Sequence, residues 1–555
     1  MDRELVPAES LLSPPYDGNV ANLLERTLTE YPDETAIEHD GEAVTYRELD
    51  ATIDRYERGL RAAGLETGDR ACVYVPNGID FCAVIWACCR AGIIASPLNP
   101  AYRRREIEYQ VDHAAAAAIV VAGDPVDHVV DAVADLEAEI LTTALAGDVD
   151  GECDSLADLG DEPVGIVAGD DSGATTSDGD GGAATTADSR SVEIVDRSDD
   201  DVLLQPYTSG TTGDPKGVLL THRNFRVQIA TSVSGYSASP VQGDALIILP
   251  MYHITGLLQM MAALCAGRTL HLVRPDRWDP ERVLELLDEY DVPSFVGVAT
   301  MFNDLLKAYD PEAYDLESLQ KAGQGGDKLP EPVQREFEET FDAPLLEGYG
   351  LTETTATTHT LRRSTLGIRA GSIGQPLGHT RSKIVDENGE EVDVGEEGEI
   401  LVDGPQVMNG YYKNPEANEE VFTEDGFFRT GDIGSRDEDN YYYVKGREKE
   451  MILTAGYNVY PREIEETLYD HPGVLEAAVF GVPDDRRGET VAAAVVTGDG
   501  ADLDEDEIEE YVLGELAPYK HPRYVEIREE LPKTGSGKVR KTVLREEFRE
   551  AYVSG

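Results

Sequence analysis

Residues 207–217 read 207-YTSGTTGDPKG-217 and lie between two apolar segments, 202-VLLQP-206 and 218-VLLTH-222. Glycines let the backbone turn tightly, so that successive N–H groups can converge on an anion, and hydroxyl side chains add further donors. The one lysine of the stretch adds positive charge. The pattern is not a P-loop, which requires G-x-x-x-x-G-K-[ST] before a helix. On composition alone, a phosphate-binding loop and a polar hairpin turning at Asp214-Pro215 fit equally well.

The rest of the chain is strongly acidic. Its 555 residues carry 47 basic and 109 acidic side chains, a formal net charge of −62. Nucleic acid and anionic membranes would be repelled by such a surface, so neither is an expected partner. Acidic residues are spread over the whole chain, which is typical of a protein from a high-salt cytoplasm, where ions screen the repulsion.

Cysteine usage and hydropathy predict a reduced, soluble, cytoplasmic protein. The six cysteines form no C-x-x-C pair, and four of them lie in apolar stretches such as 81-FCAVIWACC-89, which predicts buried free thiols. The N-terminus lacks the apolar region of a signal peptide. The longest apolar run, 83–98, is interrupted by Arg90 and Gly92 and is too short to span a bilayer.

Apolar strands alternate with helical patterns over the first 145 residues and again after residue 200, which predicts an α/β fold with layered sheets and helices. From about Gly371 the sequence is rich in turns and alternating apolar residues, which predicts a β-rich subdomain. The last hundred residues predict a small, compact C-terminal α+β domain. We place the domains at 1–445 and 446–555, with a flexible acidic insertion at about 147–199.

Further segments match the motifs of one family, in order. They are 252-YHITG-256, 323-GQGGDKL-329, 347-EGYGLTE-353, 429-RTGD-432, 446-GREKEMILTAGYNVYPREIE-465 and 532-PKTGSGKVRK-541. Together with residues 207–218, they resemble the adenylate-forming superfamily of acyl- and aryl-CoA synthetases, luciferases and peptide-synthetase adenylation domains. The resemblance covers nearly the whole chain outside 147–199, and is greatest to AMP-forming acyl-CoA synthetases.

The resemblance implies a two-step reaction. A carboxylic acid attacks the α-phosphorus of ATP, pyrophosphate leaves, and the acyl group passes from acyl-AMP to coenzyme A. Catalysis would then consist mainly of positioning and charge neutralisation at phosphorus. The implied nucleotide-binding residues are Thr208, Ser209, Gly210, Thr211, Thr212, Gly213, Lys216, Gly325, Gly326, Asp327, Tyr349, Gly350, Thr352, Asp432, Arg447 and Lys538.

The resemblance also implies individual roles. Thr352 would contact the α-phosphate, and Glu353 would bind Mg²⁺ together with Thr208, because hard cations prefer oxygen ligands. Lys538 would bridge the substrate carboxylate and phosphate during adenylation only. The remaining implied residues are His253, Leu257, Val298 and Ala299 at the acyl pocket, Lys449 as the hinge that rotates the small domain, and Gly456 in the CoA tunnel.

Two departures from the family pattern bear on the substrates. Ala299 stands where the family commonly has proline, beside the acyl pocket, and 455-AGYN-458 replaces a frequent GGEN. The pocket candidates Val296 and Gly297 are apolar like the others, which favours a fatty or other hydrophobic acid and shows no residue for a charged one.

Four alternatives stay open. They are an aryl-CoA ligase, transfer to a carrier protein, luciferase-type oxidation, and a non-catalytic relative that binds acyl groups or nucleotides. Single residues also admit plainer interpretations. Lys538 could be an exposed loop lysine, Asp432 a turn residue, and His253 a buried core histidine.

Overall fold

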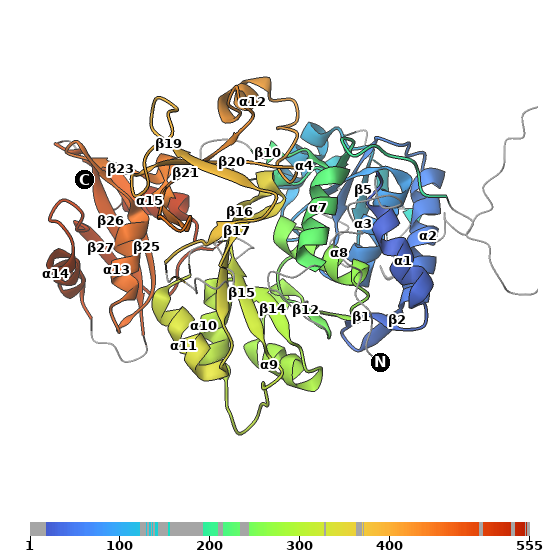
Figure 1. Cartoon of the computed structure of the whole chain (residues 1–555), viewed down its shortest axis with the longest axis horizontal. Coiled ribbons are helices and arrows are strands. Elements are labelled where there is room, and N and C mark those ends of the chain that lie inside the picture. The colour runs from blue at the N-terminus through green and yellow to red at the C-terminus, as the bar shows by residue number, and fades with distance from the viewer. Residues whose placement is uncertain are drawn as a thin grey trace, which may run out of the picture.

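The computed structural model confirms the mixed α/β fold class, with a large N-terminal and a smaller C-terminal domain (Figure 1). It describes residues 18–122, 129, 132–134, 136, 139–142, 154–155, 193–208, 215–233, 243–326, 329–361, 369, 371–484, 486–498, 503–533, 539–549 and 551. Among these residues, no helix has both the length and the apolar character needed to cross a membrane. Five of the cysteines are described, and all five are buried free thiols.

A seven-stranded sheet lies in the N-terminal part of the large domain, in the order β11-β8-β4-β3-β5-β6-β7. Its neighbours pair in parallel except β8 and β11. Apolar strands such as these suit a sheet buried on both faces. The bounds are β3 (Arg70–Tyr74), β4 (Ile94–Pro97), β5 (Ala118–Val121), β6 (Glu139–Thr142), β7 (Asp154–Ser155), β8 (Val202–Leu204) and β11 (Leu220–Thr221).

A nine-stranded sheet forms the second layer, in the order β18-β17-β16-β15-β14-β12-β13-β1-β2. The strands from β16 to β1 in this order are parallel, so their C-terminal ends share one edge. Ligands of open α/β sheets bind beyond such an edge. The bounds are β1 (Thr35–His39), β2 (Glu42–Thr45), β12 (Ala245–Ile247), β13 (Leu270–Leu272), β14 (Ser294–Gly297), β15 (Lys321–Gly325), β16 (Leu345–Leu351), β17 (Ala356–Thr360) and β18 (Gln375–Pro376).

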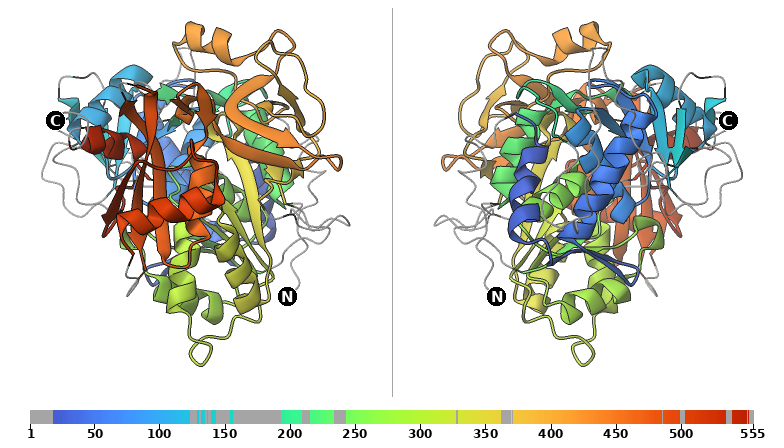
Figure 2. Two further views of the ribbon diagram at one scale, coloured as in Figure 1. Left: turned by 90° about the vertical axis from the view of Figure 1, so that its left-hand side faces the viewer. Right: turned by 90° about the vertical axis from the view of Figure 1, so that its right-hand side faces the viewer.

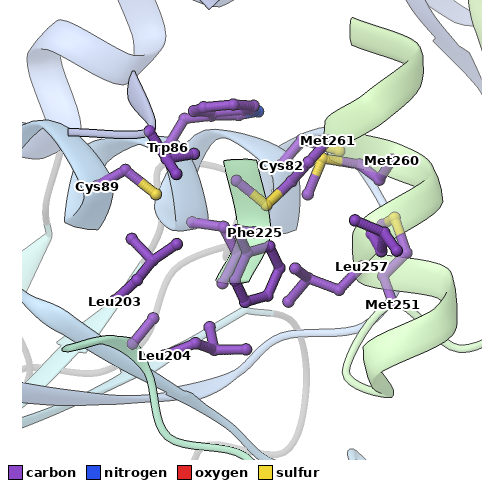
Figure 3. Packing of buried hydrophobic residues seen from close by; sticks show 14 of the residues in the cluster. Cys82, Trp86, Cys89, Leu203, Leu204, Phe225, Met251, Leu257, Met260 and Met261 are labelled. Carbon is purple, nitrogen blue, oxygen red and sulfur yellow. The ribbon is translucent and has the colours of Figure 1, made fainter. Parts of the chain in front are cut away.

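Helices fill the space between the two sheets and cover their outer faces. The inner helices are α1 (Ala21–Glu30), α2 (Tyr46–Ala62), α3 (Ile79–Ala91), α7 (His222–Val233) and α8 (Ile254–Cys265), whose side chains share one core with both sheets. Figure 3 shows Cys82, Phe225 and Leu257 from three of these helices packed together. The outer helices are α4 (Arg104–Ala114) on the first sheet, and α9 (Pro280–Glu289), α10 (Ala299–Ala308) and α11 (Glu331–Phe341) on the second.

The β-rich subdomain is an antiparallel sheet with one short helix, as the turn-rich sequence predicts. Its bounds are β19 (Arg381–Val385), β20 (Gly398–Asp403), β21 (Phe428–Arg436), β22 (Tyr442–Arg447) and α12 (Pro415–Val421). The Asn388-Gly389 dipeptide lies in a tight turn in which the Asp386 amide donates to the Glu390 carbonyl over 2.9 Å. Gly389 has a φ of +82°, which glycine adopts without strain.

The C-terminal domain is a five-stranded sheet with helices on both faces. Its bounds are β23 (Ile452–Thr454), β24 (Tyr457–Val459), β25 (Val474–Asp484), β26 (Gly488–Thr497), β27 (Tyr524–Arg528), α13 (Pro461–Tyr469), α14 (Glu505–Glu515) and α15 (Lys541–Phe548). Figure 2 shows this domain, in red, in front of the large domain in its left view. The boundary that we place at 445/446 falls inside β22, and the short helix η4 (Glu448–Glu450) is the first element beyond that strand.

Two described parts of the predicted 147–199 insertion, residues 154–155 and 193–199, belong to the fold. The short strand β7 (Asp154–Ser155) pairs in parallel with β6. At the other end, the Val195 amide donates to the Arg90 carbonyl over 3.0 Å, and Asp199 forms an ion pair with Arg226. Residues 156–192, which make up most of the predicted insertion, lie outside the described residues. The amino-acid composition does not reveal these segments, because a few residues that pair with the fold do not change the average composition of a long polar stretch.

Candidate active site

A cavity of about 2310 Å³ lies where the parallel strands β14, β15 and β16 end. The four-stranded sheet borders it, and α13 and α15 of the C-terminal domain close it from the far side. Predicted site residues that line it are Thr208, Lys216, His253, Val298, Ala299, Gly325, Gly326, Tyr349, Gly350, Thr352, Glu353, Asp432, Arg447 and Lys449. The structure thus brings together residues from 208 to 449 of the chain.

Other predicted residues are not placed in this cavity. Those outside the described part of the chain are Ser209, Gly210, Thr211, Thr212, Gly213, Asp327 and Lys538. Lys533 and Val539, which flank the segment of Lys538, form an isolated antiparallel bridge and line the cavity. Leu257 and Gly456 are described, but neither lines it.

The phosphate-loop candidate begins and ends in a hairpin. Strands β9 (Tyr207–Thr208) and β10 (Lys216–Gly217) pair antiparallel, with Thr208 opposite Lys216. The Tyr207 hydroxyl lies 2.8 Å from Nδ1 of His113. The Lys216 ammonium lies 4.8 Å from the centre of the Tyr411 ring. The hairpin and the phosphate-loop interpretations are therefore compatible, because the hairpin holds both ends of the loop at the cavity.

Asp432 joins two strands through a hydrogen-bonded triad. The Tyr349 hydroxyl of β16 donates to Oδ2 of Asp432 over 2.6 Å, and Nε of Arg447 lies 3.2 Å from Oδ1. Asp432 and Arg447 are directly paired in β21 and β22. Burial, followed by the Asp432 charge, raises the pKa of Tyr349 well above its ordinary value, so the hydroxyl stays protonated. A carboxylate has about four acceptor sites, so this one can still accept bonds from a diol.

Glu353 presents a carboxylate to the cavity from η3 (Thr352–Thr354), the turn that follows β16. The Tyr411 hydroxyl donates to its Oε1 over 2.8 Å, and the Met408 amide donates to its backbone carbonyl over 2.8 Å. Burial and the neighbouring Glu353 charge raise the pKa of Tyr411, which keeps that donor protonated. Because this bond uses one carboxylate oxygen, Glu353 fits a single-carboxylate site for Mg²⁺ beside phosphate oxygens.

Gly350 allows the site strand to bend against its neighbour. A β-bulge lies between Tyr349 and Gly350, and a Cβ added at Gly350 would lie 1.7 Å from the Ala356 carbonyl oxygen. No side chain fits there, so the glycine of the Y-G-x-T-E motif is required by packing. The bulge separates Tyr349, which contacts Asp432, from the turn that carries Glu353.

The acyl end of the cavity follows helix α8. Ile254, Leu258 and Ala262 line it at intervals of four residues, which share one helix face. Leu257 does not line it: that side chain is buried beside Phe225 and Met251 in the core between the sheets (Figure 3). The acyl-pocket prediction for Leu257 is therefore corrected, because the residue before Leu258 points about 100° away from it.

Two family models match the chain. The AMP-binding enzyme model matches residues 24–412, and the model of the AMP-binding enzyme C-terminal domain matches 463–538. The chain belongs to the AMP-binding enzyme family. This membership confirms the predicted superfamily, and relatives over nearly the full chain confirm the class of AMP-forming acyl-CoA synthetases.

Three relatives illustrate the similarity of this AMP-binding enzyme. A feruloyl-CoA synthase of an Amycolatopsis species is 34% identical, covering 93% of this chain and 96% of its own. A long-chain-fatty-acid–CoA ligase of Bacillus subtilis is 33% identical, covering 96% and 95%. The crystal structure of ATP-bound MatB from Rhodopseudomonas palustris is 31% identical with a TM-score of 0.82, covering 96% and 99%.

The C-terminal domain of the AMP-binding enzyme contacts the large domain next to the predicted hinge. Arg462 of α13 lies 3.7 Å from the Glu347 carboxylate of β16. Lys449 is exposed in η4, between the last strand of the large domain and the first of the small one. Gly456 lies on the exposed turn between β23 and β24, outside the cavity. A role for Gly456 beside CoA therefore requires the C-terminal domain to turn.

Several cavity residues were not found from the sequence. Tyr411, the partner of Glu353, lies outside the motifs, and no local signal marks it. The α8 face could have been found, because positions 254, 258 and 262 follow helical spacing. Lys321 and Arg268 also line the cavity, and the sequence prediction of wholly apolar pocket candidates missed both.

Proposed function

We propose that this AMP-binding enzyme activates a long-chain, hydrophobic carboxylic acid with ATP and then forms its CoA thioester. The observation that supports this most strongly is the shared cavity. It joins the Thr208–Lys216 hairpin, the Glu353 carboxylate and the Tyr349–Asp432–Arg447 triad to an apolar face of α8. The long-chain-fatty-acid–CoA ligases among the relatives support the same acid class.

In the first step, each charged or polar residue of the cavity would bind a different part of ATP or of the acid. Lys216 and the hairpin loop would hold the β- and γ-phosphates, and Asp432 would accept hydrogen bonds from the ribose hydroxyls. Gly325, Gly326 and Tyr349 would contact adenine. Thr352 and Lys538 would stabilise the α-phosphate as the carboxylate attacks it, since donors placed where charge develops lower the barrier. When bound at Glu353 and Thr208, Mg²⁺ would neutralise phosphate charge.

The second step needs another arrangement of the C-terminal domain. The residues flanking Lys538 line the cavity, whereas Gly456 does not. This arrangement suits adenylation. Rotation about Lys449 would withdraw Lys538 and bring the β23–β24 turn to the cavity, where the thiol of CoA attacks the acyl carbonyl and AMP leaves. In many enzymes, a mobile domain or loop closes over the active site in different arrangements for successive steps of the reaction.

An aryl-CoA ligase is the second candidate, favoured by the feruloyl-CoA synthase relatives. The cavity favours a long-chain acid over an aryl acid, because its lining continues past the acyl pocket as far as Arg268, beyond the end of α8. The charge of −62 supports a high-salt cytoplasm as the working environment. Transfer to a carrier protein in place of CoA stays a further alternative.

Pyrophosphate release tests the proposal directly. Purified enzyme would be assayed at high salt with ATP, Mg²⁺ and a panel of fatty and aryl acids, with and without CoA. We expect pyrophosphate with long-chain fatty acids and acyl-CoA only when CoA is present. Preference for ferulate would establish the aryl alternative, AMP without a CoA thioester would indicate a carrier-protein acceptor, and no response to any acid would refute the enzyme function.

A further inference from the structure

The acyl end of the cavity continues as a channel along the nine-stranded sheet. Strand alternation places Val296 and Ser294 of β14 on the same face as Gly323 and Lys321 of β15, and the register pairs Val296 with Gly323 and Ser294 with Lys321. All four residues line the cavity, as does Ala266 just beyond the end of α8. The channel therefore runs from the C-terminal edge of the sheet, where the reaction is placed, to its N-terminal edge.

Small side chains keep this channel open. Gly323 faces Val296, and a Cβ at Gly323 would lie 3.0 Å from Cγ2 of Val296. Ala245 of β12, the strand next to β14, also lines it, as do Ala262 of α8 and Ala266 just after that helix. From Ser294 to Val298 the chain advances four residues in extended conformation, or roughly 13 Å at about 3.3 Å per residue. That length suits an extended acyl chain.

The far end of the channel carries two cationic side chains, in contrast to its small and apolar walls. Lys321 is the first residue of β15, and Arg268 lies just after α8. Arg268 is held in place, because its Nε donates to the Gly243 carbonyl over 2.6 Å and its Nη2 donates to the Asp244 carbonyl. The Asp244 carboxylate offsets part of its charge.

Lys321 has no carboxylate partner in the described part of the chain. By contrast, carboxylates pair with Lys383, Lys520 and Lys533. Of the described lysines that form no ion pair, Lys307, Lys413 and Lys449 are exposed, whereas Lys216 and Lys321 are partly buried and line the cavity. Burial, followed by the Arg268 charge, lowers the pKa of Lys321, so its environment disfavours the positive form until an anion arrives.

We propose that Lys321, supported by Arg268 and the Ser294 hydroxyl, binds a carboxylate at the distal end of the acyl chain, so that the enzyme accepts long α,ω-dicarboxylic acids. This inference rests on the proposed function and narrows its substrate class. Short diacids cannot span the distance from the reaction centre to Lys321. An anion is attracted to this end of the channel although the surface as a whole repels it.

The test compares dodecanedioic acid with dodecanoic acid in the acyl-CoA assay, since the two differ only at the distal end. We expect wild-type kcat/KM for the diacid to equal or exceed that for the monoacid. Lys321→Met should lower the diacid-to-monoacid ratio about tenfold, the scale of one partly desolvated ion pair, mainly through KM. Lys321→Arg should retain most of the ratio, because it keeps the charge.

Lys307→Met is the matched control, because Lys307 is exposed on α10 and does not line the cavity. Its ratio should equal that of the wild type. An unchanged ratio in Lys321→Met, or an equal loss for both acids, would overturn the inference while leaving the synthetase function intact. Failure of the wild-type enzyme with every acid would instead refute the function on which the inference rests.

Discussion

The two ends of the cavity are built in opposite ways. At the nucleotide end, polar groups hold one another: Tyr349 and Arg447 bind Asp432, and Tyr411 binds Glu353. Along the acyl channel, small residues such as Gly323 and Ala262 leave space for a ligand. The shape of these walls, and not a set of hydrogen-bonded polar pairs, defines this end. Under the proposed function, the first end is pre-organised for the nucleotide, whereas the second would select acids by their length and by what its far end can bind.

This difference predicts two kinds of variant. Changes at the nucleotide end should affect every acid by the same factor, because each acid uses the same ATP site. Changes along the channel should affect some acids and spare others.

The largest expected effect is that of Lys538→Ala. Loss of the proposed bridging cation should lower adenylation by at least about 10²-fold for every acid, while thiolysis of supplied acyl-AMP stays near the wild-type rate. Pyrophosphate release and thioester formation measure the two steps separately. Lys307→Ala, which removes an exposed lysine of α10 outside the cavity, is the control. Full activity of Lys538→Ala from ATP and free acid would contradict the assignment.

A smaller but uniform effect is expected of Asp432→Asn. The substitution removes the charge that holds Tyr349 and Arg447, so we expect KM for ATP to rise about tenfold. Steady-state kinetics with a long and a short acid should give the same factor. Asp425→Asn is the control, because Asp425 is exposed and pairs with Lys383 away from the cavity. A factor that differs between acids would argue against a role at the nucleotide.

The channel variant Ala262→Leu should discriminate by chain length. Added methyl groups would narrow the channel at α8, so kcat/KM for hexadecanoic acid should fall about tenfold while hexanoic acid is spared. Competition between the two acids in one assay gives the ratio directly. A thermal melt should accompany it, since overpacking also destabilises cores. Equal losses for both acids would place the long chain elsewhere.

Replacement of the buried histidine His222 is expected to have the smallest effect on catalysis at neutral pH. Its Nδ1 accepts a hydrogen bond from the Val20 amide over 3.0 Å, and burial, helped by Arg197, lowers its pKa to about 4. The unfolded chain binds a proton at its ordinary pKa of about 6.5, so folding stability should fall as the pH drops from about 6.5 to about 4.

The measurement is the free energy of unfolding against pH for wild type and His222→Gln. The pH-dependent loss should be smaller in the variant by an amount on the order of 2 kcal/mol. Protonation of the many carboxylates is common to both proteins, so the difference isolates the histidine. Parallel curves would show that His222 does not titrate in this way.

Much of the fold and the nucleotide end could be predicted from the sequence. The antiparallel sheet β19–β22 lies in the turn-rich region after Gly371 where the sequence predicts a β-rich subdomain, and motif residues as distant as Lys216 and Arg447 line one cavity. The motifs predict this meeting because a nucleotide would require particular donors at particular backbone positions. The exact roles of these residues stay predictions.

The acyl end could not be predicted in the same way. Lys321 acquires its position from strand register, which pairs it with Ser294, and Arg268 acquires its position from where α8 ends. Neither fact is local in sequence. Leu257 was assigned to the wrong helix face for a related reason, because a short motif does not specify how its helix is rotated.

The connection between the two domains at η4 determines how the protein should respond to proteolysis. The buried residues in the two hydrophobic cores of the C-terminal domain all come from Ile452 onward, and those of the large-domain cores come from Val444 and earlier. Cleavage by a protease between Glu448 and Met451 would therefore cut no core. Both fragments should keep their own melting transitions, and the C-terminal domain becomes a module that can be exchanged between relatives.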